Sequence, residues 1–163
     1  DQKVMLSIDA TLEDEDIALS EVNELRKQYL QWQNDLKNGI AIYIVCQAST
    51  LTGIYPTLTK SIKGELTPLG CSFLNDAIGA DWVITVSATA REYNTQKWGN
   101  TTTYFAFVDA TLHIQKTVTN QTVYEDVVTI KGSHTLSYEE AVRAAYKDLI
   151  PQLGEIIKNQ ILL

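Results

Sequence analysis

Residues 132–146, GSHTLSYEEAVRAAY, bring together the side chains that acid–base and nucleophilic chemistry needs. A histidine could activate a serine, and an acidic residue could orient that histidine. Together the three would form the catalytic triad of a hydrolase. The strained G-x-S-x-G turn that exposes such a serine in many hydrolases is absent from the chain. The chain has two histidines, His113 and His134, so a metal site would need carboxylate ligands from elsewhere.

The same stretch also has the pattern of a helix start. Ser137 and Glu140 have the spacing of a capping box, with Leu136 at the flanking position. Apolar residues then recur at helical spacing up to Leu149. We therefore interpret this stretch as a helix start and predict no catalytic residue, no metal site and no cofactor.

One enzymatic alternative stays open. It is a hydrolase that uses His113 or His134 together with a nearby carboxylate. Such an enzyme requires the imidazole and the carboxylate to converge within hydrogen-bond reach in a pocket.

The first forty residues predict a strand and a long helix. The strand is Val4–Ala10, and an acidic run over residues 13–16 follows it. A stripe of six apolar residues then predicts a helix that ends at Asn38-Gly39; its members are Leu19, Val22, Leu25, Tyr29, Trp32 and Leu36. The acidic run suits the helix dipole, and it lacks the spacing of a calcium-binding loop.

The next segment predicts a parallel strand–helix–strand unit. The apolar run Ile40–Ala48 is typical of a strand buried on both faces. A helix follows Pro56 and ends at Gly70, before a short strand in CSFL. Cys46 and Cys71 would then lie at opposite ends of neighbouring strands, so we expect two unbonded, buried thiols.

The second half alternates between apolar and polar residues, which predicts an antiparallel meander. Its strands are DWVITVSATAREY, TYFAFVDATLHIQK and TVYEDVVTI, joined by the links NTQKWGNT and TVTNQT. A last helix follows, and Pro151 should kink or break it after Ile150.

These elements predict one α/β (α+β) domain over residues 1–163. It would have a mixed sheet with a parallel β-α-β start, a long antiparallel three-stranded meander and a C-terminal helix, with the helices mainly on one face.

The polar face of the meander is the predicted binding surface. Alternate side chains of a strand point to the same face of the sheet. This parity places six residues on that face: Arg91, Tyr93, Phe105, Phe107, Asp109 and His113. A strand of 13 residues spans about 40 Å, so the hairpin at Trp98 would overhang the core. The candidate binding residues are Arg91, Tyr93, Trp98, Phe105 and Phe107. Two alternatives remain: another segment covers this face, or Trp98 folds back onto its own sheet.

Charge and hydropathy narrow the class of partner. The net charge of −7 and pI of about 4.7 argue against nucleic acid as a partner. No apolar run approaches the roughly 20 residues that cross a bilayer, so we predict no transmembrane segment. The sequence opens DQKVMLSIDA without an initiator Met, and we expect a mature exported protein rather than a trimmed one.

A family resemblance supports that expectation. It is carried by LTKSIKGELTPLGCSFLNDAIGADWVITVSATA, by FVDATLHI and by QTVYEDVVTIKGSHTLSYEEAVRAAYKDLIPQL. Over roughly residues 55–153 the pattern resembles bacterial envelope lipoprotein domains of the LPP20, penicillin-binding-protein-activator, curli-secretion-protein and TolB N-terminal type. The chain departs from that pattern in lacking a lipoprotein cysteine at its start.

The resemblance implies a non-catalytic, exported binding or accessory module, periplasmic or anchored at the outer membrane. The expected partner is another envelope protein or a cell-wall component. A self-assembling protein that pairs through its long edge strands is the remaining alternative.

Overall fold

The computed structural model describes residues 15–162, with the side chains of residues 18–30 and 39–162. The chain divides into two compact units, residues 1–39 and 40–163. In the first unit, helix α2 (Glu15–Asn38) confirms the predicted helix, and Gly39 with a φ of 64° follows it. The predicted strand Val4–Ala10 lies outside the described residues. None of the helices in the described range combines the length and hydrophobicity of a membrane span.

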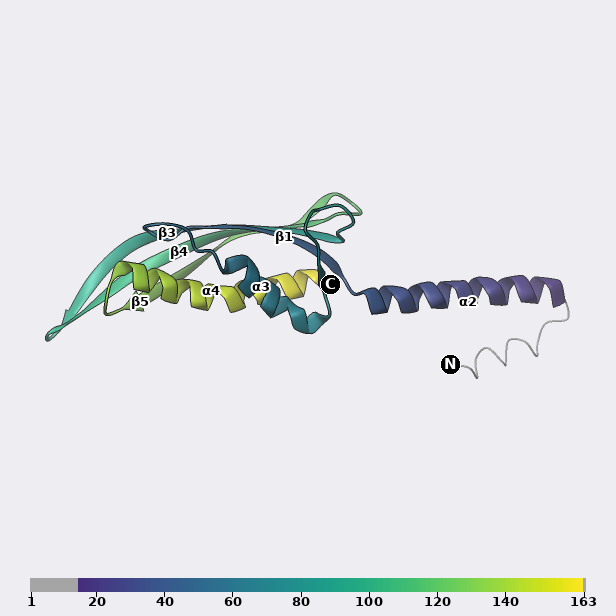
Figure 1. Cartoon of the computed structure of the whole chain (residues 1–163), viewed down its shortest axis with the longest axis horizontal. Helices are drawn as coiled ribbons and strands as arrows, with labels where there is room; N and C mark the ends of the chain where they lie inside the picture. The colour runs from purple at the N-terminus through teal and green to yellow at the C-terminus, as the bar shows by residue number, and fades with distance from the viewer. Residues whose placement is uncertain (1–14, 163) are drawn as a thin grey trace. The chain divides into compact units, whose positions relative to one another are not determined.

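The second unit is a five-stranded mixed sheet with helices packed on it (Figure 1). The strands lie in the order β2-β1-β3-β4-β5; β1 is parallel to β2 and β3, and β3, β4 and β5 are antiparallel. Their bounds are β1 Ala41–Ala48, β2 Ser72–Phe73, β3 Trp82–Trp98, β4 Thr101–Lys116 and β5 Gln121–His134. The helices are α3 Leu58–Leu66, continued by the 3-10 turn η1 Thr67–Leu69, and α4 Tyr138–Ile161. Figure 1 shows α3 and α4 on the same side of the sheet. The predicted mixed α/β fold is confirmed, and its extension over residues 1–163 as one domain stays a prediction.

The core lies between the sheet and these two helices. The predicted alternation is confirmed, because Ile84, Val86 and Ala88 are buried whereas Thr85, Ser87 and Thr89 are exposed. On β1 the prediction of burial on both faces is wrong, since the fully buried residues lie only on the helix-facing side. Ile42 and Ile44 are buried there, and Tyr43 and Val45 are half-buried. The opposite face of the sheet is therefore left open by α3 and α4.

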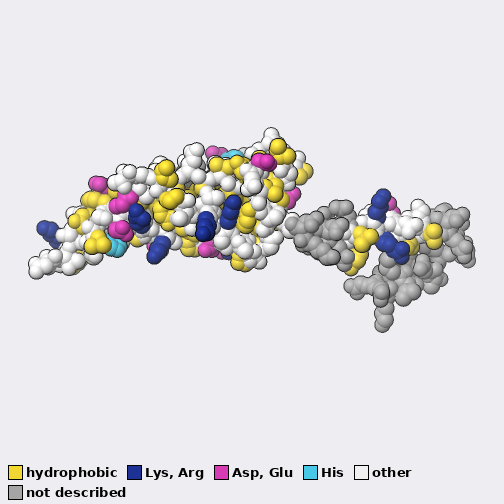
Figure 2. Space-filling model, viewed as in Figure 1, with side chains coloured by type: hydrophobic (Ala, Val, Ile, Leu, Met, Phe, Trp, Pro, Cys, Tyr) yellow, Lys and Arg dark blue, Asp and Glu magenta, His cyan; other side chains and the backbone are white. Residues whose placement is uncertain are grey.

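The outer surface mixes residue types. On the face shown in Figure 2, hydrophobic, basic and acidic side chains are interspersed over the sheet-and-helix unit. The described residues of this face do not gather one sign of charge.

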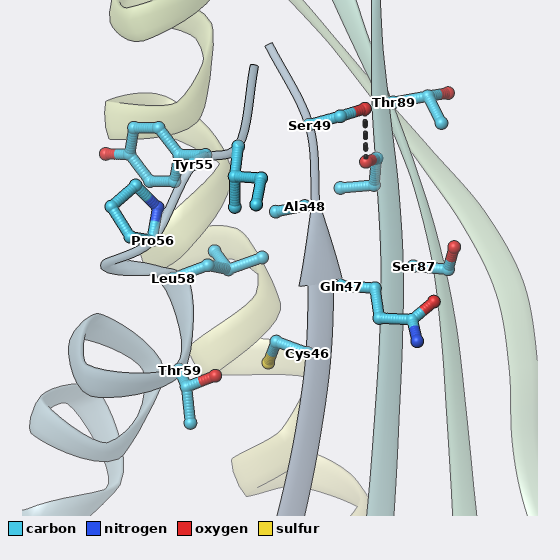
Figure 3. A pocket seen from close by; sticks show the side chains of 12 residues that line it. Cys46, Gln47, Ala48, Ser49, Tyr55, Pro56, Leu58, Thr59, Ser87 and Thr89 are labelled. Atoms are coloured by element: carbon cyan, nitrogen blue, oxygen red, sulfur yellow. Dashed lines mark hydrogen bonds between the residues drawn. The ribbon is translucent and has the colours of Figure 1, made fainter.

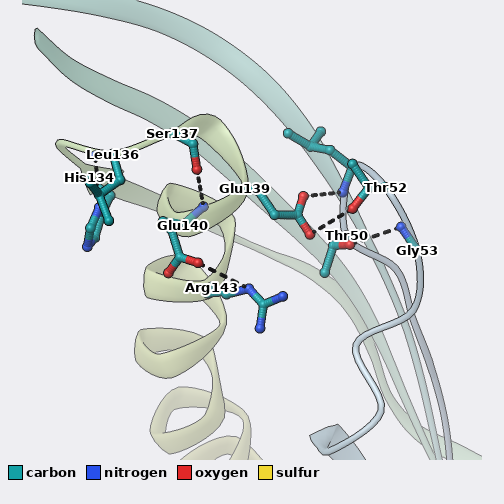
Figure 4. A network of polar contacts seen from close by, with 10 residues as sticks. Thr50, Thr52, Gly53, His134, Leu136, Ser137, Glu139, Glu140 and Arg143 are labelled. Atoms are coloured by element: carbon teal, nitrogen blue, oxygen red, sulfur yellow. Dashed lines mark hydrogen bonds and ion pairs between the residues drawn. The ribbon is translucent and has the colours of Figure 1, made fainter.

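Helix α4 begins as predicted. The Oγ of Ser137 accepts a hydrogen bond from the Glu140 amide at 3.2 Å. The Glu140 carboxylate pairs with Arg143 at 3.7 Å (Figure 4). Leu136 is 72% exposed, so it does not act as a flanking hydrophobic anchor.

The predicted break at Pro151 is wrong, because α4 continues from Tyr138 to Ile161. A proline removes one backbone donor from the helix. The apolar stripe of α4 keeps its spacing across that position, with Leu149 before it and Leu153 after it, both fully buried. Packing on the sheet therefore holds the helix together across the missing hydrogen bond.

A close approach between α4 and β5 explains a glycine within the sheet. A Cβ at Gly132 would lie 2.1 Å from the carbonyl oxygen of Ala141 and 2.6 Å from the amide nitrogen of Ala145. Glycine inside a strand often marks such an approach of another backbone. The predicted end of the last meander strand at Ile130 is wrong, since β5 continues through Gly132 and Ser133 to His134.

The thiols of Cys46 and Cys71 are free, as predicted, although both are half-buried rather than buried. Burial raises the pKa of both thiols, and for Cys46 a hydrogen bond with Thr59 opposes that effect.

Candidate binding surface

The two histidines lie far apart. On β4, Tyr104 is the partner of His134 in β5, and His113 lies nine residues further along. At about 3.3 Å per residue this separation is about 30 Å. The two side chains also lie on opposite faces: His113 flanks the buried Leu112 and Ile114, whereas Tyr104 packs on the α4 side.

Each imidazole has a simple polar partner. His113 Nε2 lies 3.0 Å from the Thr122 hydroxyl, and His134 Nδ1 accepts the Leu136 amide at 3.1 Å. Among the described residues, neither imidazole forms a hydrogen bond or an ion pair with a carboxylate. The structure therefore gives the hydrolase alternative no assembled acid–base pair.

A pocket of about 660 Å³ does lie beside His134, between the loop after β1 and α4. Arg143 and Lys147 line it together with Glu140. Because Glu140 pairs with Arg143, part of the positive charge of this pocket is already neutralised. In the described part of the chain, no group of three or more His, Cys, Asp or Glu residues could hold a metal ion.

The open sheet face brings together most of the predicted binding residues. An ion pair lies at its centre, with Arg91 Nε donating to Asp109 Oδ2 at 2.8 Å. The Thr129 hydroxyl donates to the other carboxylate oxygen at 2.7 Å. The guanidinium of Arg91 also stacks over the Phe107 ring, 4.3 Å from its centroid. Asp109 thus orients the cation against the aromatic ring.

Lys131 joins the remaining aromatic residues. Its ammonium lies 4.5 Å from the centroid of Phe105 and 5.0 Å from that of Tyr93. The Tyr93 and Phe107 rings meet edge to face, with centroids 5.0 Å apart. Two cations and three aromatic rings therefore form one connected surface, which we call the aromatic–cation surface; it consists of Arg91, Tyr93, Phe105, Phe107 and Lys131.

An irregularity in β3 positions Tyr93. The β3–β4 register shifts between Glu92 and Asn94, so Tyr93 is the extra residue of a β-bulge. Bulges redirect a side chain and increase the local twist. Tyr93 is 54% exposed while its ring edge contacts Phe107, so much of the ring remains available to a partner.

The hairpin tip differs in part from the sequence prediction. The predicted link NTQKWGNT is mostly strand, because β3 continues to Trp98 and the turn is Gly99-Asn100. Gly99 has a φ of 60°, which a tight hairpin turn requires of its first central residue. Trp98 is 74% exposed, so the alternative in which it folds back onto its own sheet is wrong.

Lys131 was missed because the sequence pattern ends the last meander strand at Ile130. Thr129 lies within that predicted strand, and only the register between the strands places it beside Asp109. With β5 extended to His134, Lys131 lies opposite Phe107 and Thr129 opposite Asp109. If the alternation of side chains is continued one residue past Ile130, it places Lys131 on this face. His113 lies four residues along β4 from Asp109, toward the other end, and is not part of the surface.

The ion pair predicts a specific titration. The hydrogen bond from Arg91 holds the pKa of the Asp109 carboxyl below its usual value of 3.8. A depressed pKa means that the pair stabilises the fold above the unfolded-state pKa and loses this effect as pH falls through the folded-state pKa. We expect the carboxyl ¹³C resonance of Asp109 to titrate below pH 3.8, and to titrate at a higher pH in Arg91→Ala. An unchanged midpoint in that variant would show that Arg91 does not hold the carboxylate.

Comparisons with known proteins bear on the fold. No protein-family model matches the chain, and no curated protein sequence matches it. Solved structures do resemble it. A minor lipoprotein from Acinetobacter baumannii is 20% identical, with a TM-score of 0.47, over 78% of this chain and 94% of that chain. Rare lipoprotein B from Shewanella oneidensis is 11% identical, with a TM-score of 0.45, over 74% and 93%. Lipoprotein GNA1162 from Neisseria meningitidis is 15% identical, with a TM-score of 0.40, over 76% and 98%.

All three are bacterial lipoproteins, the class that the sequence pattern resembles. At this level of identity the likeness concerns the fold alone. The function of the chain has to be argued from its own surface.

Proposed function

We propose that this chain is a non-catalytic binding module of the bacterial envelope. It is exported and acts in the periplasm or at the outer membrane. It binds another envelope protein or a cell-wall component through the aromatic–cation surface and the hairpin tip at Trp98.

One observation carries the proposal: cations and aromatic rings are already arranged on an open face. Lys131 contacts Tyr93 and Phe105, and Arg91 contacts Phe107 while Asp109 holds it. Tyrosine, tryptophan and arginine dominate the binding energy of protein interfaces. Side chains that are already oriented lose less conformational entropy when a partner binds.

The position of this surface adds a second argument. Helices α3 and α4 lie on the other side of the sheet, so neither covers it (Figure 1). Trp98, in the same hairpin, is 74% exposed. A large aromatic side chain at a hairpin tip adds reach to the surface beside it.

Self-assembly through the outer edge of β5 has less support. Glu125, Asp126 and Lys131 place charges along that strand, and charged edge strands resist pairing with another copy. Asp126 also accepts the amide of Val127 at 2.7 Å, which occupies a donor that a second strand would need.

A crosslinking experiment tests the proposal. A photoreactive amino acid replaces Trp98, and the protein is irradiated in an envelope extract of the source organism. We expect one specific adduct that is reduced at least about tenfold by Tyr93→Ala or Phe107→Ala, since hot-spot side chains each contribute about 2 kcal/mol or more. Val118→Ala is the matched control, because Val118 is 84% exposed in the turn at the other end of β4.

Two results would contradict the proposal. One is an adduct that persists in both aromatic variants. The other is an adduct lost equally in Val118→Ala, which would indicate a nonspecific effect on the protein.

A further inference from the structure

Strand β1 has an outer edge that the fold fills only at its two ends. On one side β1 pairs with β3 from Ile42 to Ala48. On the other side β2 pairs only with Ala41 and Ile42, and the chain leaves the sheet after Leu74. At the far end, the Ala48 carbonyl accepts the Tyr55 amide at 2.9 Å. The stretch between these ends has no neighbouring strand.

The backbone groups that face this edge can be identified from its ends. The carbonyls of Ile40, Ile42 and Ala48 all accept hydrogen bonds from the β2 side or from the returning loop. Backbone groups alternate in direction along a strand, so the even-numbered residues point toward the outer edge. Ile44 and Cys46 therefore direct their N–H and C=O groups to that edge. Within the described residues, the structure gives these groups no hydrogen-bond partner there.

A pocket of about 480 Å³ lies along the same edge (Figure 3). Cys46 and Ala48 contribute its strand side, and Tyr55, Pro56 and Leu58 face them from the loop and the start of α3. None of the residues that line the pocket is charged; they are Cys46, Gln47, Ala48, Ser49, Ile54, Tyr55, Pro56, Leu58, Thr59, Ser87, Ala88 and Thr89. An uncharged, partly apolar segment fits such a lining better than a charged one.

Helix α4 holds the far wall of this pocket in place. The ring of Tyr146 stacks on Tyr55 with centroids 4.1 Å apart, and its hydroxyl donates to the Ser49 carbonyl at 2.7 Å. The Glu139 carboxylate accepts the Leu51 amide and the Thr52 hydroxyl, each at 3.2 Å (Figure 4). The loop is therefore fixed by contacts distant in sequence, and the edge stays open beside a preformed wall.

We propose that the outer edge of β1 is a strand-addition site for an extended, uncharged peptide segment of another protein. The segment hydrogen-bonds to the backbone of Ile44 and Cys46. It occupies the position that β2 would fill if β2 continued past Phe73. Every second side chain of the segment faces the pocket wall at Ile54, Tyr55 and Leu58. Alternating backbone donors and acceptors recognise an extended polypeptide, and the uncharged lining selects apolar or small polar side chains. The site is separate from the aromatic–cation surface.

Amide hydrogen exchange on the whole chain tests this site. The probe is the synthetic peptide acetyl-TVTVTVT-amide at millimolar concentration. We expect the amides of Ile44 and Cys46 to exchange at least about tenfold more slowly when the peptide is bound, because opening of a paired amide limits its exchange. The amides of Tyr43 and Val45 point toward β3 and act as internal references. The same peptide methylated on every backbone nitrogen keeps its side chains but has no backbone N–H donor, and it should give no protection.

A matched pair of variants locates the contact. Ile54→Asp places a charge at the pocket wall, where Ile54 is 78% exposed, and should weaken peptide binding by about tenfold. Ile78→Asp introduces the same charge at a residue that is 86% exposed and outside the pocket, and should leave binding unchanged.

Three outcomes would overturn the proposal. These are no protection at Ile44 and Cys46, protection along β5 instead, and equal loss of binding in both aspartate variants. Phe107→Ala should leave peptide binding intact, so failure of this site and failure of the aromatic–cation surface are distinguishable.

Discussion

Replacing Gly132 by alanine is expected to lower the free energy of unfolding by about 3 kcal/mol, at the upper end of the cost of overpacking. The new Cβ would lie 2.1 Å from the Ala141 carbonyl oxygen and 2.9 Å from the Ala145 Cβ. The closest of these atoms belongs to the backbone of α4, so no side-chain rotation relieves the contact. The helix as a whole has to move away from β5. Chemical denaturation followed by circular dichroism measures the effect.

Gly64→Ala is the matched control for that experiment. Gly64 lies in α3, and nothing approaches within 4 Å of its added Cβ. Alanine is favoured over glycine in a helix by about 0.8 kcal/mol, so this variant should gain stability. A loss below about 1 kcal/mol for Gly132→Ala would show that α4 is not held tightly against β5.

The second large effect is expected at Tyr146. This side chain is fully buried, stacks on Tyr55 and bonds to the Ser49 carbonyl. Tyr146→Ala should cost about 4 kcal/mol, as other large aromatic truncations in cores do. It should also release the loop after β1, which thermolysin would cut before the exposed Ile54 faster than in the parent protein. A stable Tyr146→Ala variant with a protected loop would contradict this role.

Tyr146→Phe separates the hydroxyl from the ring. The ring packing stays, and the lost hydrogen bond should cost about 1 kcal/mol.

Burial raises the pKa of the Tyr146 phenol from 10.0 to about 12. A group whose pKa is raised by folding contributes its full stabilisation at pH values below its unfolded-state pKa. That stabilisation is lost as the pH rises through its folded-state pKa. The parent protein should therefore lose stability more steeply than Tyr146→Phe between pH 10.0 and about 12. Equal slopes would contradict the burial of this phenol.

The sequence was sufficient to predict the faces of the sheet. Alternating residues such as Val86 and Ser87 differ so strongly in hydropathy that one register alone buries the apolar set. Tyr93, Phe105 and Phe107 were predicted to share the open face for this reason, and they contact one another or Lys131 there. Parity is a local property, so the sequence carries it up to the bulge at Tyr93, where the register shifts and the alternation reverses.

Strand ends were harder to predict, because they depend on partners. Thr95 and Gln96 look like link residues, yet they pair with Tyr104 and Thr103 in the hairpin. Gly132 looks like a turn residue, and only the proximity of α4 explains it as a strand residue. The open edge of β1 depends on where β2 stops, and no pattern within β1 encodes that.

The sheet order has a consequence for how the chain folds. Strand β1 lies between β2 and β3, although β2 and β3 follow each other closely in the chain. The meander β3–β4–β5 needs only short hairpin closures, whereas β1 pairs with β3 across 40 residues of sequence, as in Ile42 with Trp82. Long closures carry the larger entropic barrier and slow folding. The insertion of β1 is therefore expected to be the late step, and until it occurs β3 presents an uncovered edge on which another chain could misassemble.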